Sequence, residues 1–261
     1  MHRFAYGARF FLTGNVLYDM ITKKLVERVL IMKIMQRILA KSRDNMNNRP
    51  ISITFLGDSV TQGCFEERSY DQFAVYHHQL KEMLTYLYPN VVFNMINAGI
   101  GGDSAYHAAE RLERDVLSSS PDLVVVCLGL NDVSLGMDGL PRYIDALSRI
   151  FIRLQEEEIE TIFMTPNMIC TEVSDDETAH PVYAGKLAKL QADGTFDTYM
   201  NAAKELCYDR GVTVCDCHAK WKLLQQNGIS VTRLLCNRIN HPAREMHKLF
   251  AIELLRTILE N

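Results

Sequence analysis

The stretch ISITFLGDSV, residues 51–60, joins an apolar, β-branched run to a Gly-Asp-Ser turn. The run Ile51–Leu56 predicts a strand that is buried on both faces, because it is mostly apolar and rich in strand-forming residues. Gly57 ends the run, and Ser59 follows two residues later. A hydroxyl group at the edge of a sheet is a candidate nucleophile, provided that the chain also supplies a base and donors for an oxyanion.

The rest of the chain alternates short apolar runs with amphipathic segments. We expect five strands, at Ile51–Leu56, Val91–Ile96, Leu123–Leu128, Thr161–Thr165 and Val212–Cys215. We expect helices at residues 17–44, 70–88, 104–117, 141–158, 196–210 and 242–259. This alternation predicts a doubly wound α/β fold with a parallel sheet between two helical layers. Ligands in such folds bind beyond the carboxyl ends of the strands.

Two segments interrupt this regular pattern. The polar stretch 42–50 marks the boundary that we predict between a helical extension, residues 1–48, and a main domain, residues 49–261. Residues 166–195 contain Pro166, Pro181 and an acidic run, and we expect them to form a long excursion over the site, such as a lid or specificity loop.

Charge is distributed unevenly between the two predicted parts. Residues 1–49 hold 10 Lys or Arg against 3 Asp or Glu, whereas the remainder holds 18 against 29. The formal net charge of −4 argues against a nucleic-acid-binding protein. We interpret the basic extension as a helical arm packed on the acidic body. Contact of this arm with an anionic membrane surface is the less favoured alternative.

The chain shows neither a clear signal peptide nor an apolar stretch long enough to span a membrane, which favours the cytoplasm. The seven cysteines form no paired framework and predict reduced thiols. Cys215-Asp216-Cys217-His218 lacks a second cluster with ligand spacing, so we interpret it as a strand end. We expect no metal.

Four motifs follow expected strand ends or precede the last helix. They are Gly57-Asp58-Ser59-Val60, the glycine-rich residues 97–104, Gly129-Leu130-Asn131-Asp132 and Asn240-His241-Pro242. Acyl transfer needs a hydroxyl with an imidazole beside it, and hydrogen-bond donors for the anion that forms on the carbonyl oxygen. A glycine offers an unobstructed backbone N–H, and an asparagine offers a side-chain amide. Ser59, His241, Gly102 and Asn131 are therefore one sufficient set.

Each motif alone also has a simpler interpretation. Gly99, Gly101 and Gly102 are compatible with a tight turn or with a phosphate cradle in a nucleotide-binding protein. Asn131-Asp132 is compatible with a capped turn, and His241 with a cap before Pro242 at the first position of a helix. The ordered set of four is what favours the catalytic interpretation.

In this order the four motifs resemble those of the SGNH hydrolases, the GDSL-type esterases and lipases. The resemblance runs from about residue 50 to the C-terminus. It implies a flavodoxin-like three-layer α/β/α sandwich with a five-stranded parallel sheet, and ester hydrolysis without a cofactor. It also implies that Ser59 is the nucleophile and an oxyanion donor, that Gly102 and Asn131 are the other donors, and that His241 is the general base.

One position departs from the family pattern. Arg238 stands three residues before His241, where the family usually has an aspartate that orients the imidazole. Three accounts compete: a backbone carbonyl accepts from His241 and leaves a working dyad, a carboxylate such as Asp216 reaches in, or activity is weak or lost. We favour the dyad, because the tautomer needs only an acceptor of suitable geometry. Asn237 is a candidate supporting residue.

Neighbouring residues receive weaker assignments. Asp58 is expected to hold its loop through backbone N–H groups, and Cys64, Phe65 and Glu66 to line the pocket. Asn167 is a further candidate for the pocket wall. The resemblance implies a serine esterase that acts on a short acyl ester, for example an O-acetylated carbohydrate. The alternatives are a lipid esterase or thioesterase of the same mechanism, and a binding module for acylated sugar or lipid without turnover.

Overall fold

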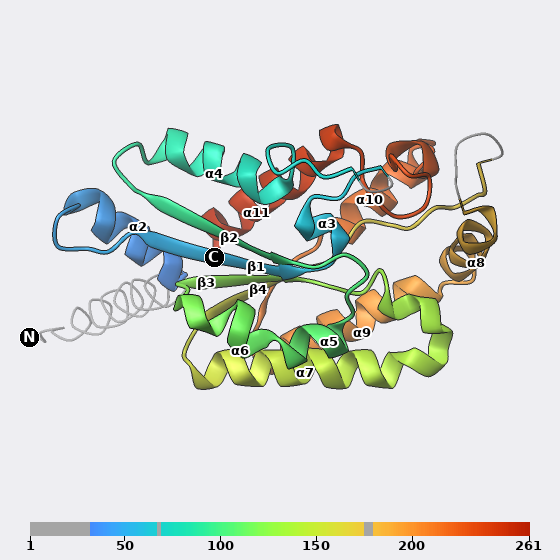
Figure 1. The fold of residues 1–261 in the computed structure, drawn as a ribbon, viewed down its shortest axis with the longest axis horizontal. Helices are drawn as coiled ribbons and strands as arrows, with labels where there is room; N and C mark the ends of the chain where they lie inside the picture. Colours follow the sequence, from blue (N-terminus) through green and yellow to red (C-terminus); the bar gives the residue numbers. More distant parts are fainter. Residues whose placement is uncertain (1–31, 67–68, 175–179) are drawn as a thin grey trace, which may run out of the picture.

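Five parallel strands form the centre of the molecule, in the spatial order β2-β1-β3-β4-β5 (Figure 1). The computed structural model describes residues 32–66, 69–174 and 180–261. The strands are β1 (Ile51–Gly57), β2 (Phe93–Gly99), β3 (Leu123–Cys127), β4 (Glu160–Met164) and β5 (Thr213–Cys215). Every residue of β1 and β3 is buried, which explains why their sequences are mostly apolar. The predicted strands are confirmed to within three residues at each end.

Helices cover both faces of this sheet, so the predicted three-layer sandwich is confirmed (Figure 1). One layer contains α4 (Tyr76–Leu87), α10 (Cys217–Gln226) and α11 (His247–Glu260). The other contains α5 (Ala105–Glu110), α6 (Leu112–Asp115), α7 (Leu140–Glu156) and α9 (Thr195–Arg210). The short α3 (Ser59–Gln62) and α8 (Pro181–Ala192) lie near the carboxyl ends of the strands, where function was expected.

Helix α2 (Lys33–Arg43) belongs to the predicted basic extension and packs on the sheet. Its Ile34 and Ile38 side chains are fully buried in the core. Glu160, the first residue of β4, accepts hydrogen bonds from the N–H groups of Lys33 and Ile34 at 2.9 and 2.8 Å. A carboxylate at a helix N-terminus satisfies unpaired donors and complements the helix dipole. Residues 1–31 of the extension lie outside the described residues.

Several helical segments differ from the prediction, and the helices expected to begin at residues 70 and 242 begin at Tyr76 and His247. Residues 166–195 are not wholly irregular, because Pro181 begins α8 at the first helical position, where proline is favoured. Helix α10 was not predicted; it begins where the Asp216 side chain accepts from the Ala219 N–H. The single helix expected at 104–117 is broken at Arg111, whose backbone leaves the helical region between α5 and α6.

Candidate active site

Ser59 occupies the first position of α3, directly beyond the carboxyl end of β1. Asp58 caps this helix, and its carboxylate accepts a hydrogen bond from the Val60 N–H at 3.0 Å. The change from strand to helix is tight: a Cβ added at Gly57 would lie 2.1 Å from Thr61 Oγ1 and 2.9 Å from the Cys127 carbonyl. Glycine at position 57 therefore allows Ser59 to stand at the edge of the sheet.

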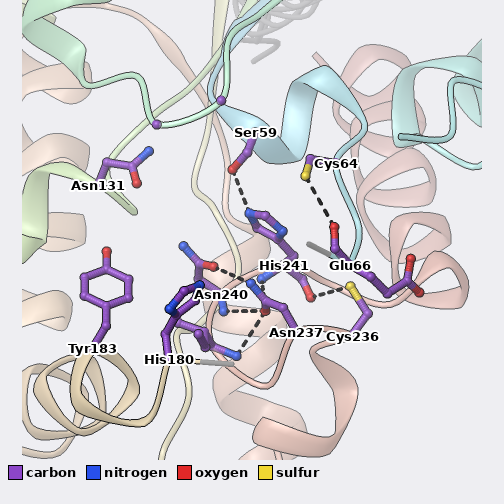
Figure 2. A pocket seen from close by; sticks show the side chains of 13 residues that line it. Ser59, Cys64, Glu66, Asn131, His180, Tyr183, Cys236, Asn237, Asn240 and His241 are labelled. Atoms are coloured by element: carbon purple, nitrogen blue, oxygen red, sulfur yellow. Dashed lines mark hydrogen bonds between the residues drawn. The ribbon is translucent and has the colours of Figure 1, made fainter. Parts of the chain in front are cut away.

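His241 lies beside Ser59, although the two residues are 182 positions apart. The distance from Ser59 Oγ to His241 Nε2 is 2.8 Å, and Figure 2 shows the two side chains pointing toward one another. On its other side, His241 Nδ1 lies 2.8 Å from the backbone carbonyl of Phe65. A carbonyl can only accept, so Nδ1 carries the proton and Nε2 is left as the acceptor for the Ser59 hydroxyl.

Burial lowers the pKa of His241 below its ordinary value, and the hydrogen bond to the Phe65 carbonyl opposes this in part. The imidazole is therefore neutral at neutral pH, with its unprotonated nitrogen facing Ser59. This is the protonation state that a general base needs before it takes a proton.

The glycine-rich loop after β2 meets Ser59 from the other side. A Cβ added at Gly101 would lie 3.9 Å from Ser59 Cβ, and Gly102 has the left-handed φ of 78°. Among the described residues, the backbone N–H groups of Ser59 and Gly102 donate to no acceptor. Asn131 Nδ2 donates to the Asp103 carbonyl at 2.8 Å, which leaves its second hydrogen for another acceptor. Ser59, Gly102 and Asn131 line one cavity, as the sequence predicted.

A buried arginine that the sequence analysis did not single out supports both loops from below. Arg111 Nη1 donates to the Ala98 carbonyl at 2.7 Å, and Nη2 donates to the Gly57 carbonyl at 3.0 Å. Its Nε pairs with the Asp103 carboxylate at 2.7 Å. Arg111 thus connects the ends of β1 and β2 from the point where α5 ends and α6 begins.

Two further carboxylates are buried beneath the site. Burial, together with the charges of Asp132 and Asp103, raises the pKa of Asp58 to about 7. Burial raises the pKa of Asp132 to about 6, against the effect of its hydrogen bond from the Ala105 N–H. Asp58 accepts from the Val60 N–H in the turn of Ser59, and Asp132 accepts from the Ala105 N–H that follows the glycine-rich loop. Both carboxylates therefore have a structural role, which is to hold the loops of the site through backbone hydrogen bonds.

The turn that carries His241 is organised by one asparagine. Asn237 Oδ1 accepts from the N–H groups of Ile239, Asn240 and His241, at 3.0, 3.0 and 2.9 Å. Asn237 Nδ2 donates to Asn240 Oδ1 at 2.9 Å. Asn167, which is fully buried, donates to the Asn240 carbonyl at 2.9 Å and so fastens the same turn to the chain after β4.

Neither Arg238 nor Asp216 orients the imidazole. Arg238 has a left-handed φ of 57°, and its guanidinium donates to the carbonyls of Arg233 and Leu235. Asp216, the alternative carboxylate, instead caps α10 and accepts from Thr165 Oγ1 and Lys204 Nζ. Asp216 is therefore a helix cap, and the alternative that it supports the imidazole finds no contact, since these groups occupy its oxygens and the Phe65 carbonyl stands at His241 Nδ1.

The site opens into a cavity of about 490 Å³ (Figure 2). Its wall contains Cys64 and Glu66, as expected, whereas Phe65 is fully buried behind it. Tyr183 of α8 and its N-cap residue His180 also line the cavity. Both belong to residues 166–195, which were expected to lie over the site, although neither residue was singled out. The lining residues are Ser59, Cys64, Glu66, Gly101, Gly102, Asn131, His180, Tyr183, Cys236, Asn237, Ile239, Asn240 and His241.

A comparison with family profiles matches residues 55–249 to the GDSL-like lipase/acylhydrolase family. The matched range includes Ser59, Gly102, Asn131 and His241. The chain belongs to this family.

One similar curated protein is an acetylxylan esterase from Geobacillus stearothermophilus. It is 30% identical over 86 residues, which are 31% of this chain. The match spans 39% of that relative, well under two thirds of its length.

Solved structures extend the likeness over most of the chain. A crystal structure of an acetylxylan esterase from Geobacillus stearothermophilus is 23% identical, with a TM-score of 0.61, over 80% of this chain and 94% of the other. The acetyl xylan esterase AlAXEase is 23% identical, with a TM-score of 0.62, over 80% and 100%. A gut microbial diltiazem-metabolizing enzyme is 23% identical, with a TM-score of 0.62, over 80% and 47%. At these identities the likeness shows a shared fold.

Two features are absent from the part of the chain that the structure describes. No helix within residues 32–66, 69–174 and 180–261 has both the length and the apolar character of a membrane span. In the same part of the chain, no three His, Cys, Asp or Glu side chains are grouped to hold a metal ion. The Cys215 and Cys217 sulfur atoms are 3.7 Å apart, while the His218 ring pairs with Asp197.

Proposed function

We propose that the chain is a serine carboxylic-ester hydrolase that works through an acyl-enzyme, with Ser59 as nucleophile and His241 as general base. The observation that carries this proposal is the 2.8 Å approach of Ser59 Oγ to His241 Nε2, with Nδ1 satisfied by the Phe65 carbonyl. Family membership supports the same class of reaction.

In the proposed reaction, Ser59 Oγ attacks the acyl carbon while its proton passes to His241 Nε2. The imidazolium that forms is stabilised by the carbonyl of Phe65, which accepts from Nδ1. The N–H groups of Ser59 and Gly102 and the Asn131 amide donate to the anionic oxygen of the tetrahedral intermediate.

Collapse of the intermediate breaks the ester bond, and the leaving alcohol takes the proton from His241 Nε2. A water molecule, with His241 as base, then attacks the acyl carbon. This second attack releases the carboxylic acid and restores the Ser59 hydroxyl.

The proposed substrate class is a short acyl ester, foremost an acetyl group on a carbohydrate. Its support is the likeness to acetylxylan esterases, together with a cavity that Ser59 shares with the polar residues His180 and Tyr183. The binding-module alternative was based on Arg238 in place of a carboxylate. That argument weakens, because a carbonyl acceptor stands at His241 Nδ1.

The test is hydrolysis of p-nitrophenyl esters from acetate to octanoate, alongside acetate release from acetylated xylooligosaccharides. We expect the highest kcat/KM for the acetyl esters. Ser59→Ala should lower kcat by about 10⁶-fold, because the nucleophile is removed and only the oxyanion donors remain. The exposed Ser118, whose hydroxyl donates to the Arg114 carbonyl, offers the matched control Ser118→Ala, which should keep full activity. Unchanged turnover in folded Ser59→Ala would refute the proposal.

A further inference from the structure

Arg244 lies three residues after His241 and reaches across to the loop that carries the acceptor of His241. We propose that Arg244 is a positioning residue, which holds the Phe65 carbonyl at His241 Nδ1 and so maintains the reactive tautomer. This inference rests on the proposed serine-esterase function and adds to it a residue that no family motif predicts.

The guanidinium of Arg244 binds both ends of the 66–71 segment. Nη1 and Nη2 donate to the two carboxylate oxygens of Glu66 at 2.6 and 3.1 Å. This is a bidentate pair, whose geometry is more specific than that of a single hydrogen bond. Nε pairs with Asp71 Oδ2 at 3.3 Å. The other oxygen of Asp71 accepts from the N–H groups of Phe73 and Ala74, so this carboxylate is itself fixed.

Arg244 also contacts the residue whose carbonyl is at issue. Its guanidinium carbon lies 4.4 Å from the centre of the Phe65 ring, within the range of a cation–π interaction. The Phe65 ring is fully buried and lies 4.8 Å from the ring of His247 on α11. The carbonyl belongs to the peptide bond between Phe65 and Glu66. Arg244 therefore binds the side chains on both sides of that peptide.

This contact matters because of where the acceptor comes from. By family resemblance, an orienting aspartate would stand three residues before the histidine, on the same turn. In this chain the acceptor is 176 residues away, on a different loop. The position of the carbonyl relative to the imidazole therefore depends on contacts between the two loops, and Arg244 supplies several of them.

The exposure of the Arg244 and Glu66 side chains indicates whether their ion pair mainly positions the carbonyl or mainly stabilises the fold. The Arg244 and Glu66 side chains are 37% and 49% exposed, so the ion pair itself adds little to the free energy of folding. The hydrogen bond from Arg244 lowers the pKa of Glu66 to about 2. The pair therefore stays ionised throughout the neutral range. Removing Arg244 should disturb the geometry at His241 more than it disturbs folding.

The experiment compares Arg244→Ala and Arg244→Lys with Arg256→Ala in the full chain. Arg256 is an exposed arginine of α11. It pairs with Glu253 and Glu260, and neither of these partners lines the cavity. We expect Arg244→Ala to lower kcat for p-nitrophenyl acetate about ten- to a hundredfold, since a displacement of roughly 1 Å has that effect. KM should change less than twofold, and Arg244→Lys should fall between Ala and the unaltered protein.

The readout specific to positioning is the tautomer of His241, measured by ¹⁵N NMR of the imidazole at neutral pH and assigned with His241→Ala. The unaltered protein should show the proton on Nδ1, whereas Arg244→Ala should show a mixture of tautomers. Thermal midpoints followed by circular dichroism should be similar in all variants.

Full kcat in folded Arg244→Ala would overturn the proposal, as would a reduced kcat with an unchanged tautomer. If Arg244→Ala does not fold, Glu66→Gln and Arg244→Lys decide, and an unaltered tautomer in both would refute the role of Arg244. The NMR signal does not require turnover. A protein with the expected tautomer change but no esterase activity would contradict the proposed function, and would leave the positioning of the imidazole supported.

Discussion

The turns that carry Ser59 and His241 are built in different ways. The Ser59 turn is local: β1 ends at Gly57, Asp58 caps α3, and the cap bonds to a residue two positions later. The backbone of the His241 turn is organised by the nearby Asn237, but the orientation of its imidazole and its attachment to the neighbouring loop depend on distant partners. The Phe65 carbonyl, 176 residues away, accepts from its imidazole, and Asn167, 73 residues from Asn240, secures its backbone.

This difference predicts how substitutions in each of the two turns affect turnover. A local turn is specified by a few consecutive residues and forms whenever its strand and helix form. A turn secured by distant contacts is correct only when several separate loops are in place. We therefore expect substitutions around His241 to affect turnover through geometry, whereas substitutions at Ser59 act through loss of a reacting group.

The largest expected effect comes from His241→Ala, which removes the proposed general base. We expect kcat for p-nitrophenyl acetate to fall about 10⁶-fold, as when the histidine of a serine-histidine unit is removed. His78→Ala is the control, because His78 lies on α4 and its charged neighbour there is Glu82. A loss smaller than tenfold in His241→Ala would mean that another group takes the proton.

The next largest effect is expected from Asn237→Ala, which removes the acceptor for three backbone N–H groups of the His241 turn. We expect kcat/KM to fall about ten- to a hundredfold through displacement of the imidazole. The free energy of unfolding should fall by about 1–3 kcal/mol, because donors lose their partner. Urea unfolding and steady-state kinetics measure the two effects.

Asn237→Asp is the matched control, since it keeps an oxygen in place of Oδ1. We expect it to retain most of the stability that Asn237→Ala loses. Equal stability of Asn237→Ala and the unaltered protein would show that the His241 turn forms without the Asn237 acceptor. The two turns would then differ less in how they are held than we infer.

A smaller effect is expected on changing the pH. Burial lowers the pKa of His241 below its ordinary value of 6.5, and the neutral form is the active base. Activity should therefore be full at neutral pH and should fall as the pH drops through a midpoint below 6.5, by about tenfold per pH unit beyond it. The measurement is kcat/KM for p-nitrophenyl acetate between pH 4.5 and 8, and a midpoint above 7 would contradict the burial argument.

The smallest effect is expected from Arg238→Asp, which restores the family's usual residue. His241 Nδ1 already donates to the Phe65 carbonyl, and aspartate tolerates the left-handed φ of 57° at this position. We expect kcat/KM to change less than about threefold, since one acceptor replaces another of similar strength. A gain of a hundredfold would show that the carbonyl is a poor substitute, and that the distant contact limits this chain.

The same contrast explains which features were predictable. Ser59, Gly102, Asn131 and His241 each stand in a motif at a strand or helix end, and the geometry brings them together. The acceptor of His241 was expected to be a backbone carbonyl, but no pattern indicated which one. Every residue carries a carbonyl, so residue type gives no signal.

Other features were missed for related physical reasons. Arg111 follows Ala108 on the apolar face of an expected helix, and a charged residue at that spacing was the available signal for a buried cation. Helix α8 buries little besides Ala184, Leu187 and Gln191, so its apolar periodicity is weak. The salt bridges of Arg244 join residues more than 170 positions apart, which no local pattern reveals.

Arg111 has a consequence for anyone who redesigns this site. One cation bonds to the carbonyls of Gly57 and Ala98 and to Asp103, so the two loops on either side of the proposed ester site are held by the same side chain. Removing one partner of a buried ion pair costs about 3–5 kcal/mol, because the other charge is left unpaired. Directed evolution toward bulkier esters can therefore vary the residues that line the cavity, but should keep the buried pair Arg111 and Asp103. A library that spares positions 103 and 111 will retain far more working members than one that varies them.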